Sequence, residues 1–281
     1  MRHNNSYQID ILMVADYSVY TNFLHIVRGD EYSAFFATED YLYAIFEQWK
    51  SEYIKAKSLS IRMSGLDAVN YVQKWMADYS QWIPPHNHII VLTRVDLLSS
   101  KGESNIQGMA YVGAMCRVAE SASVVEDIGG MATAVIAAHE LAHSLGAFHD
   151  GATGGAEKCK KNYLMSATVS SSDDEQIFFN TFKLSGTADC LLRSKSRERR
   201  LRRTSQRKLR RPGELLVQQH QCKIAFGPHY SVCTRKEYLS QDPCRRLWCK
   251  NRQLRKTEPC ETKVYLPLLD GTKCGPDKVN S

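Results

Sequence analysis

The sequence predicts an α/β fold, and three features of its apolar pattern carry this prediction. Residues 8–15 alternate as a strand, residues 36–55 place apolar side chains at helical spacing, and residues 87–95 read as a central strand. The chain has 281 residues and a 43% apolar content, which is normal for a globular protein with a sizeable core. This length suits one domain of about two hundred residues with a small additional module.

The elements follow one another along the chain in an order that supports this fold class. Residues 59–64 read as a further strand, and residues 67–79 as a second helix. Pro84 and Pro85 break the chain before the central strand. No apolar run approaches the about 20 residues that would span a membrane. The long helix is expected from seven core-type side chains, namely Phe36, Tyr41, Tyr43, Ile45, Phe46, Trp49 and Tyr53.

Residues 139–150 read His-Glu-Leu-Ala-His-Ser-Leu-Gly-Ala-Phe-His-Asp and predict a metal site. His139 and His143 are four residues apart, so on a helix they project from one face and reach one ion. Gly146 falls where the helix must end and turn, which brings His149 back as a third ligand. Three protein nitrogens leave one zinc position open for water, which is typical of a catalytic site. Glu140 is free to accept a proton from that water.

Two histidines and a glutamate on one helix face also occur without a metal, as a polar face with satisfied side chains. The glycine and the third histidine at fixed offsets weigh strongly against this alternative. The preceding run, residues 131–138, is a buried-type stretch of good helix formers, and Gly129 and Gly130 precede it as a loop.

This motif, followed by Tyr163-Leu-Met-Ser166, resembles the metzincin zinc endopeptidases, and Asp150 after the third histidine is similar to their adamalysin (reprolysin) branch. The segments 9–16, 87–97 and 108–116 resemble the first, central and substrate-binding edge strands of that branch. The resemblance covers residues 7–192. It implies a mixed twisted sheet with long helices, an active-site helix and a Met-turn, with Met165 as the apolar floor under the metal. The implied substrate strand includes Gly108, Ala110, Tyr111, Val112 and Gly113.

The cysteine-rich end of the chain is similar in its cysteine order to the disintegrin-like module of ADAMTS proteases and of the reprolysin-like proteases of tick saliva. Six of the nine cysteines fall in the last sixty residues, which predicts a disulfide framework from an oxidising compartment. Scattered thiols or a second metal site are the alternatives, and the absence of C-x-x-C pairs disfavours the metal. We therefore expect a protease domain at 7–192, a basic and disordered linker at 193–213, and a partial disintegrin-like or cysteine-rich module at 214–281.

The resemblance also implies a disulfide and a calcium site in the protease domain. Cys116 is expected to pair with Cys190, which leaves Cys159 as a free thiol or a partner of the tail. Calcium would be held by Asp10 and Asp96, near the carbonyl of Cys190. Relatives supply an Asn or Asp three residues after that cysteine, whereas this chain has an arginine, which argues against a permanent occupant. The other interpretation of Asp10 is a paired carboxylate at a strand start.

The linker is the most basic segment of the chain. Residues 193–211 contain eleven Lys or Arg and one Glu, a net charge of +10 in a chain of +7, so the remainder sums to −3. Three interpretations stay open: a solvated linker, a site for sulfated glycosaminoglycans, or processing at Arg197–Arg200 and Arg200–Arg203, which resemble furin-type sites. No aromatic residue interleaves the run, which disfavours nucleic-acid binding.

Two further sequence features bear on the setting of the protein. Residues 1–8 contain no apolar signal sequence, and the protease domain begins at once, so we expect a fragment or a mature form of a secreted protein. Arg28-Gly29-Asp30 is an integrin-type tripeptide that lies inside the protease domain. Chance occurrence is the favoured interpretation, unless the tripeptide is exposed at the tip of a loop.

The sequence thus predicts a secreted zinc endopeptidase that cleaves extracellular matrix or plasma proteins. Zinc would lower the pKa of its water to about 7, and Glu140 would accept the proton and pass it to the leaving amine. The substrate would lie extended along the strand near Gly108 to Gly113 by β-augmentation. The alternative is a non-catalytic matrix- or integrin-binding protein that uses the basic linker and the cysteine-rich tail.

Overall fold

The computed structural model describes residues 9–45, 50–53, 62–115, 117–153, 157, 164–167, 211–239, 244, 246–255, 257–262, 268–275 and 278–279. Its centre is a five-stranded sheet in the order β2-β1-β4-β7-β6. The strands β2 (Lys50–Tyr53), β1 (Ile11–Ala15), β4 (His88–Thr93) and β7 (Ala122–Glu126) run parallel, and β6 (Gly108–Ala110) is antiparallel at one edge. The predicted α/β class with a mixed sheet is confirmed.

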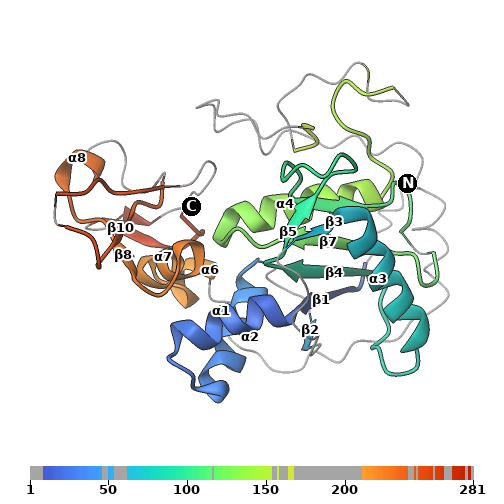
Figure 1. Cartoon of the computed structure of the whole chain (residues 1–281), viewed down its shortest axis with the longest axis horizontal. Helices are drawn as coiled ribbons and strands as arrows, with labels where there is room; N and C mark the ends of the chain where they lie inside the picture. Colours follow the sequence, from blue (N-terminus) through green and yellow to red (C-terminus); the bar gives the residue numbers. More distant parts are fainter. Residues whose placement is uncertain are drawn as a thin grey trace, which may run out of the picture.

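Helices cover both faces of this sheet (Figure 1). Alternate side chains of β1 and β4 point to opposite faces, because successive residues of a strand do so. One face packs against α1 (Tyr17–Ile26), α2 (Glu31–Ile45) and α4 (Gly130–Ser144). The other face packs against α3 (Gly65–Asp78) and the small parallel pair β3 (Arg62–Ser64) and β5 (Asp96–Leu98). Both faces of the central strands are therefore buried, as is typical of parallel sheets.

The prediction of one long helix over 36–55 is wrong. The helix α2 begins at Glu31 and ends at Ile45, and residues 50–53 form the strand β2 beside β1. The sheet offers residues 50–53 a free edge, so tertiary pairing overrides the helical spacing of the aromatic residues. The helix α1 was not predicted from the sequence, although Asp16 caps it by accepting a hydrogen bond from the backbone N–H of Val19 at 3.0 Å.

The C-terminal module is a small, disulfide-bonded unit. It contains α6 (Pro212–Leu215), α7 (Gln218–Phe226), α8 (Lys236–Leu239) and the strands β8 (Tyr230–Val232), β9 (Cys249–Asn251), β10 (Lys273–Gly275) and β11 (Lys278–Val279). The predicted disulfide framework is confirmed, and it pairs Cys222 with Cys249, Cys233 with Cys260, and Cys244 with Cys274.

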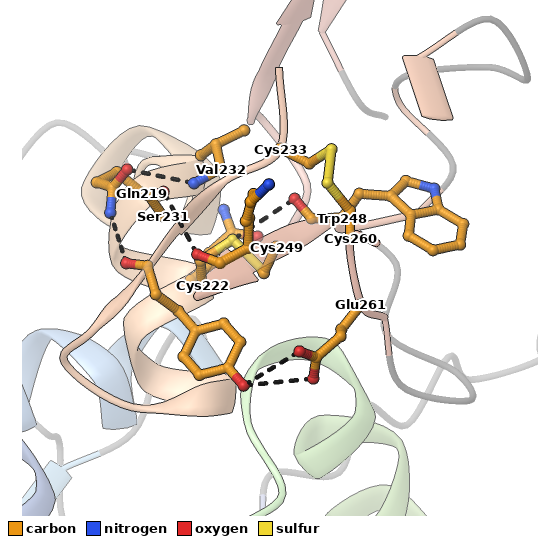
Figure 2. The surroundings of a disulfide bond; sticks show 12 residues. Gln219, Cys222, Ser231, Val232, Cys233, Trp248, Cys249, Cys260 and Glu261 are labelled. Carbon is orange, nitrogen blue, oxygen red and sulfur yellow. Dashed lines mark hydrogen bonds between the residues drawn. A yellow bond between two sulfur atoms is a disulfide. The ribbon is translucent and has the colours of Figure 1, made fainter. Parts of the chain in front are cut away.

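Figure 2 shows how the first disulfide is embedded in the module. The side chain of Gln219 donates to the carbonyl of Tyr230 at 3.0 Å and accepts from the N–H of Val232 at 3.3 Å, so it ties α7 to β8. The Tyr230 hydroxyl donates to both carboxylate oxygens of Glu261 at 3.3 Å. These polar contacts and the disulfides stabilise a module whose apolar core is small.

The module packs directly against the N-terminal α/β fold (Figure 1). Leu216, Ile224 and Leu269 belong to the same buried cluster as Phe23, Tyr41 and Ile136. Residue Gly129, at the start of α4, lies so close to α7 that a Cβ atom there would be 2.7 Å from the Cα of Ala225. The two parts of the chain therefore share one core. Within the described residues, no helix is both long and apolar enough to cross a membrane.

Candidate metal centre

The helix α4 carries the predicted metal ligands, and its ends are set by glycines. Gly129 is the N-cap with φ 101°, and Gly146 follows the helix with φ 98°. The N–H of Gly146 donates to the carbonyl of His143 at 2.8 Å, and the N–H of Ala147 donates to that of Ala142 at 2.9 Å. This is the Schellman pattern, which needs a residue tolerant of positive φ after the helix. The turn is what returns the chain toward the histidines.

The three predicted histidines converge. The Nε2 atom of His149 lies 3.2 Å from that of His139 and 3.0 Å from that of His143. Among the described residues, these three form the one group of His, Cys, Asp or Glu side chains arranged to hold a metal. A tetrahedral zinc ion with bonds of about 2.0–2.1 Å separates its ligand nitrogens by about 3.3 Å. The spacing of the imidazoles therefore fits zinc.

Hydrogen bonds fix the tautomers of the first two ligands. The Nδ1 atom of His139 lies 2.7 Å from the carbonyl of Leu164, and that of His143 lies 2.8 Å from the carbonyl of Ala147. A carbonyl only accepts, so each Nδ1 donates its proton and each Nε2 keeps a lone pair for the metal. Burial lowers the pKa of all three imidazoles, to about 4 for His143, which favours the neutral ligand form.

Glu140 is buried beside this cluster and lies over the edge strand. A Cβ atom built on Gly108 would be 2.5 Å from Oε1 of Glu140 and 2.7 Å from its Cγ. The absence of a side chain at residue 108 therefore makes the room that this carboxylate occupies. Burial raises the pKa of Glu140 to about 8. A dication at the three imidazoles would oppose this rise, because a nearby positive charge favours the carboxylate.

The predicted Met-turn residues 164–167 contact the segment that carries the three histidines. Met165 is buried against Ala142 and Ala147. The Met165 carbonyl accepts from the N–H of Asp150 at 2.8 Å. The carbonyl of the preceding residue, Leu164, accepts from Nδ1 of His139. The segment 164–167 thus contacts both ends of the histidine motif. The role of Met165 as an apolar floor stays a prediction that this placement favours.

The predicted substrate strand lies at the sheet edge beside Glu140. The strand β6 pairs with β7 on one side, and Tyr111 and Val112 just after it are exposed. The Tyr111 hydroxyl donates to Asn70 of α3 at 2.9 Å, so this side chain turns toward α3. The N–H of Gly113 donates to the carbonyl of His143 at 2.9 Å, which ties the end of the edge segment to α4.

The structure does not bring together the two carboxylates of the predicted calcium site. The backbone N–H of Asp10 donates to the side-chain oxygen of Asn87 at 2.8 Å, and the Asp10 carbonyl accepts from the N–H of Asn87 at 2.7 Å, so Asp10 lies beside the start of β4. Asp96 follows the other end of β4, about 20 Å along an extended strand. There it pairs with Arg62 at 3.2 Å and accepts from Ser104 at 2.8 Å. Binding of one calcium ion by both Asp10 and Asp96 is therefore wrong, because β4 keeps these residues at opposite ends of the sheet, and Cys190 lies outside the described residues.

Several other predicted features lie elsewhere in the structure. The tripeptide Arg28-Gly29-Asp30 is exposed in the turn between α1 and α2, and the Asp30 carboxylate accepts from the Ser33 hydroxyl at the start of α2. This hydrogen bond between side chains engages the carboxylate that integrin-type recognition would use. The cysteines Cys116, Cys159 and Cys190 and the linker residues 193–210 lie outside the described residues.

Two polar groups that the sequence motifs did not indicate pack against α4. Asp127, two residues before Gly129, accepts from Tyr41 at 2.5 Å, from Thr133 at 3.0 Å and from Arg94 at 2.9 Å. His88 is buried beneath the other end of the helix, among serine hydroxyls. A charged residue or a histidine within an otherwise apolar strand region was the available signal for both.

Nitrogen ligands at this spacing, with a buried carboxylate one residue after the first ligand, define the class of zinc-dependent metallopeptidases, and zinc is the cofactor of this site. A comparison with protein families agrees. The chain belongs to the metallopeptidase family M12, whose residue pattern matches residues 5–178. The pattern described as ADAMTS cysteine-rich domain 2 matches residues 212–279.

The chain is similar to much longer proteins over part of their length. One relative is the Mus musculus protein named "A disintegrin and metalloproteinase with thrombospondin motifs 13". The chain is 30% identical to it over 221 residues, which cover 72% of this chain and 15% of that protein. It is 32% identical over 200 residues to the corresponding protein 16 of Homo sapiens, with coverages of 68% and 15%. The chain thus spans about a seventh of the length of these two relatives.

Solved structures share only a distant likeness with the chain. Archaemetzincin from Methanopyrus kandleri has a TM-score of 0.34 and 15% identity, over 60% of this chain and 86% of that one. Metalloproteinase-II from Bacteroides fragilis has a TM-score of 0.33 and 15% identity, over 60% and 49%. The assignment of the fold therefore rests on the strand order and the family match.

Proposed function

We propose that the protein is a secreted zinc endopeptidase that hydrolyses peptide bonds of extracellular matrix or plasma proteins. The observation that carries this proposal is the convergence of three imidazole Nε2 atoms beside the buried carboxylate of Glu140. The three disulfides support an oxidising, extracellular setting. Because the chain covers only a small part of its relatives, their substrates remain part of the proposal.

The residues of the chain divide the reaction between them. Zinc at the three histidines supplies Lewis acidity and lowers the pKa of water. The free edge of β6 aligns an extended peptide by backbone hydrogen bonds. Glu140 removes one proton from the attacking water as the new carbon–oxygen bond forms, and it delivers that proton to the amide nitrogen as the carbon–nitrogen bond breaks. One water is consumed for each peptide bond.

The replacement Glu140→Gln tests the assignment of the base. It keeps the size of the side chain above Gly108 and removes its basicity. Peptide cleavage should fall by at least about 100-fold while one zinc per chain is retained, because Glu140 is no ligand. Cleavage of a denatured protein such as gelatin and the metal content of the same preparation are the measurements. Undiminished cleavage at full zinc content would mean that Glu140 is not the base.

We also propose that sulfated glycosaminoglycans bind the basic segment 193–211. Its charge supports this, and the module adds to it: residues 212–281 carry a net +5, whereas residues 1–192 carry −8. The basic character is thus shared by the linker and the module. Retention on immobilised heparin that falls steeply with salt is expected. Retention unchanged when the arginines of 193–211 are replaced by glutamine would contradict the proposed segment.

A further inference from the structure

A second imidazole lies behind the metal centre, on the sheet side of α4. His88 begins the strand β4 and is fully buried. Its Nδ1 atom lies 2.9 Å from the Ser121 hydroxyl and its Nε2 atom 3.0 Å from the Ser123 hydroxyl. The Ser144 hydroxyl lies 3.4 Å from the same Nε2 atom. The described residues thus surround this ring with three hydroxyl groups from two different layers of the fold.

The two layers are the sheet and the active-site helix. Ser121 directly precedes β7 and Ser123 is its second residue, so both face the same side of the sheet as His88. Ser144 is the last residue of α4. The ring of His88 therefore bridges the sheet to the final turn of the helix, at a place where apolar packing is the usual link between the two.

The final turn of α4 carries the proposed base Glu140 and the zinc ligand His143. Ser144 directly follows the ligand His143, and its hydroxyl donates to the carbonyl of Glu140 at 3.2 Å. The carbonyl of Ser144 accepts from the N–H of Met115 at 2.9 Å, just beyond the edge strand. A displacement of Ser144 would move the base, one ligand and the substrate edge together.

The ring suits this place because it is neutral there. Burial, with a smaller contribution from His86, lowers the pKa of His88 to about 3. A neutral imidazole offers one donor and one acceptor, and hydroxyl groups complement either nitrogen. The Ser144 hydroxyl gives its hydrogen to the Glu140 carbonyl, so its oxygen accepts from the ring, and Nε2 carries the ring proton that it shares between the Ser123 and Ser144 oxygens. The Nδ1 lone pair then accepts from the Ser121 hydroxyl.

We propose that His88 is a positioning residue for the metal centre, since it bridges Ser121 and Ser123 of the sheet to Ser144 at the end of α4 and so holds His143 and Glu140 in place. The kinetic part of this inference rests on the proposed peptidase function, whereas its metal-binding part does not. Residues that orient zinc ligands from outside the coordination shell commonly change metal affinity by tenfold or more.

The test uses the full chain with three replacements. His88→Leu replaces the imidazole by an apolar side chain of similar size and so removes both ring nitrogens. His88→Gln keeps one donor and one acceptor. Ile89→Ala is the matched control, because Ile89 is buried on the opposite face of the same strand, against the α3 layer. It should lower stability without reaching α4. Zinc affinity is measured with zinc alone, by competition against a chromophoric chelator, at a temperature where every variant is folded.

We expect His88→Leu to weaken zinc binding by about tenfold and to lower kcat more than it raises KM. His88→Gln should return to within about threefold of the wild type. Amide hydrogen exchange of residues 140–147 should rise in His88→Leu and remain unchanged in Ile89→Ala. Wild-type zinc affinity and exchange in a folded His88→Leu variant would overturn the proposal.

A second experiment, on Ser144→Ala, tests the same contact if the leucine variant does not fold. Ser144→Ala removes only the hydroxyl on the helix side and should weaken zinc binding by about threefold. Adding His88→Leu to it should then cost less than the two separate losses combined, because both act through one contact. Additive losses would contradict the bridge. If the wild type binds zinc tightly but cleaves no peptide, the proposed function fails while these zinc measurements still decide the role of His88.

Discussion

The two ends of the active-site helix are held by different chemistry. At the N-terminal end, the buried carboxylate of Asp127 accepts from Tyr41, Thr133 and the N–H of Gly129, and it pairs with Arg94 at 2.9 Å. At the C-terminal end, the contacts are neutral: backbone turns, hydroxyls and the ring of His88.

The charged end is also the end that the C-terminal module touches. The guanidinium of Arg94 donates both to Asp127 and, at 3.2 Å, to the carbonyl of Ile224 in α7. An anion at a helix N-terminus is favoured by the helix dipole. The helix is therefore anchored at its N-terminal end by a charged network shared with the module, while neutral contacts position the end that bears the metal ligands.

Breaking the charged end should have the largest effect on stability. Asp127→Asn leaves Arg94 and the surrounding donors without a buried anion, which should cost about 3–5 kcal/mol of unfolding free energy. Denaturant unfolding measures this loss. The matched control is Glu120→Gln, because Glu120 pairs with Arg117 at 3.4 Å on the surface, where such a pair contributes about 0–1 kcal/mol. Equal losses in the two variants would refute the assigned importance of Asp127.

A larger side chain beside Glu140, near the C-terminal end of α4, should lower activity rather than stability. Gly108→Ala places a methyl group where Glu140 now lies, so the carboxylate must rotate away. We expect kcat to fall by about 100-fold, a typical effect of losing a positioned general base, with zinc content unchanged. Steady-state kinetics and metal analysis measure this. A variant with wild-type kcat would show that the carboxylate does not need this position.

The titration of His88 should have no effect on stability at neutral pH and a growing effect in acid. Its pKa of about 3 in the folded chain lies below the ordinary 6.5, so the unfolded chain binds this proton more readily. Its contribution to stability is complete above about pH 6.5 and is lost as the pH falls toward 3. Relative to His88→Gln, the wild type should lose about 1.4 kcal/mol per pH unit within this window. Parallel pH profiles of unfolding free energy would contradict the buried, neutral state.

The parts of the molecule that depend on local spacing were predictable from the sequence. The motif of residues 139–150 placed three ligands and Glu140, and the strand patterns found β1 and β4. Tertiary partners decided the rest. Residues 50–53 became a strand because β1 offered an edge, and Asp10 lies beside Asn87 at the start of β4, far from Asp96 beyond its end. The roles of Asp127 and His88 depend on contacts across more than thirty residues of sequence, which no local pattern reveals.

The coordination of zinc tests the central claim most directly. X-ray absorption at the zinc edge of the purified, metal-loaded full chain should report three nitrogen neighbours at about 2.0–2.1 Å and one oxygen neighbour. Exchange of that oxygen for a peptide hydroxamate would confirm an open position. Sulfur neighbours, or four protein nitrogens, would contradict a site built from His139, His143 and His149 with room for water.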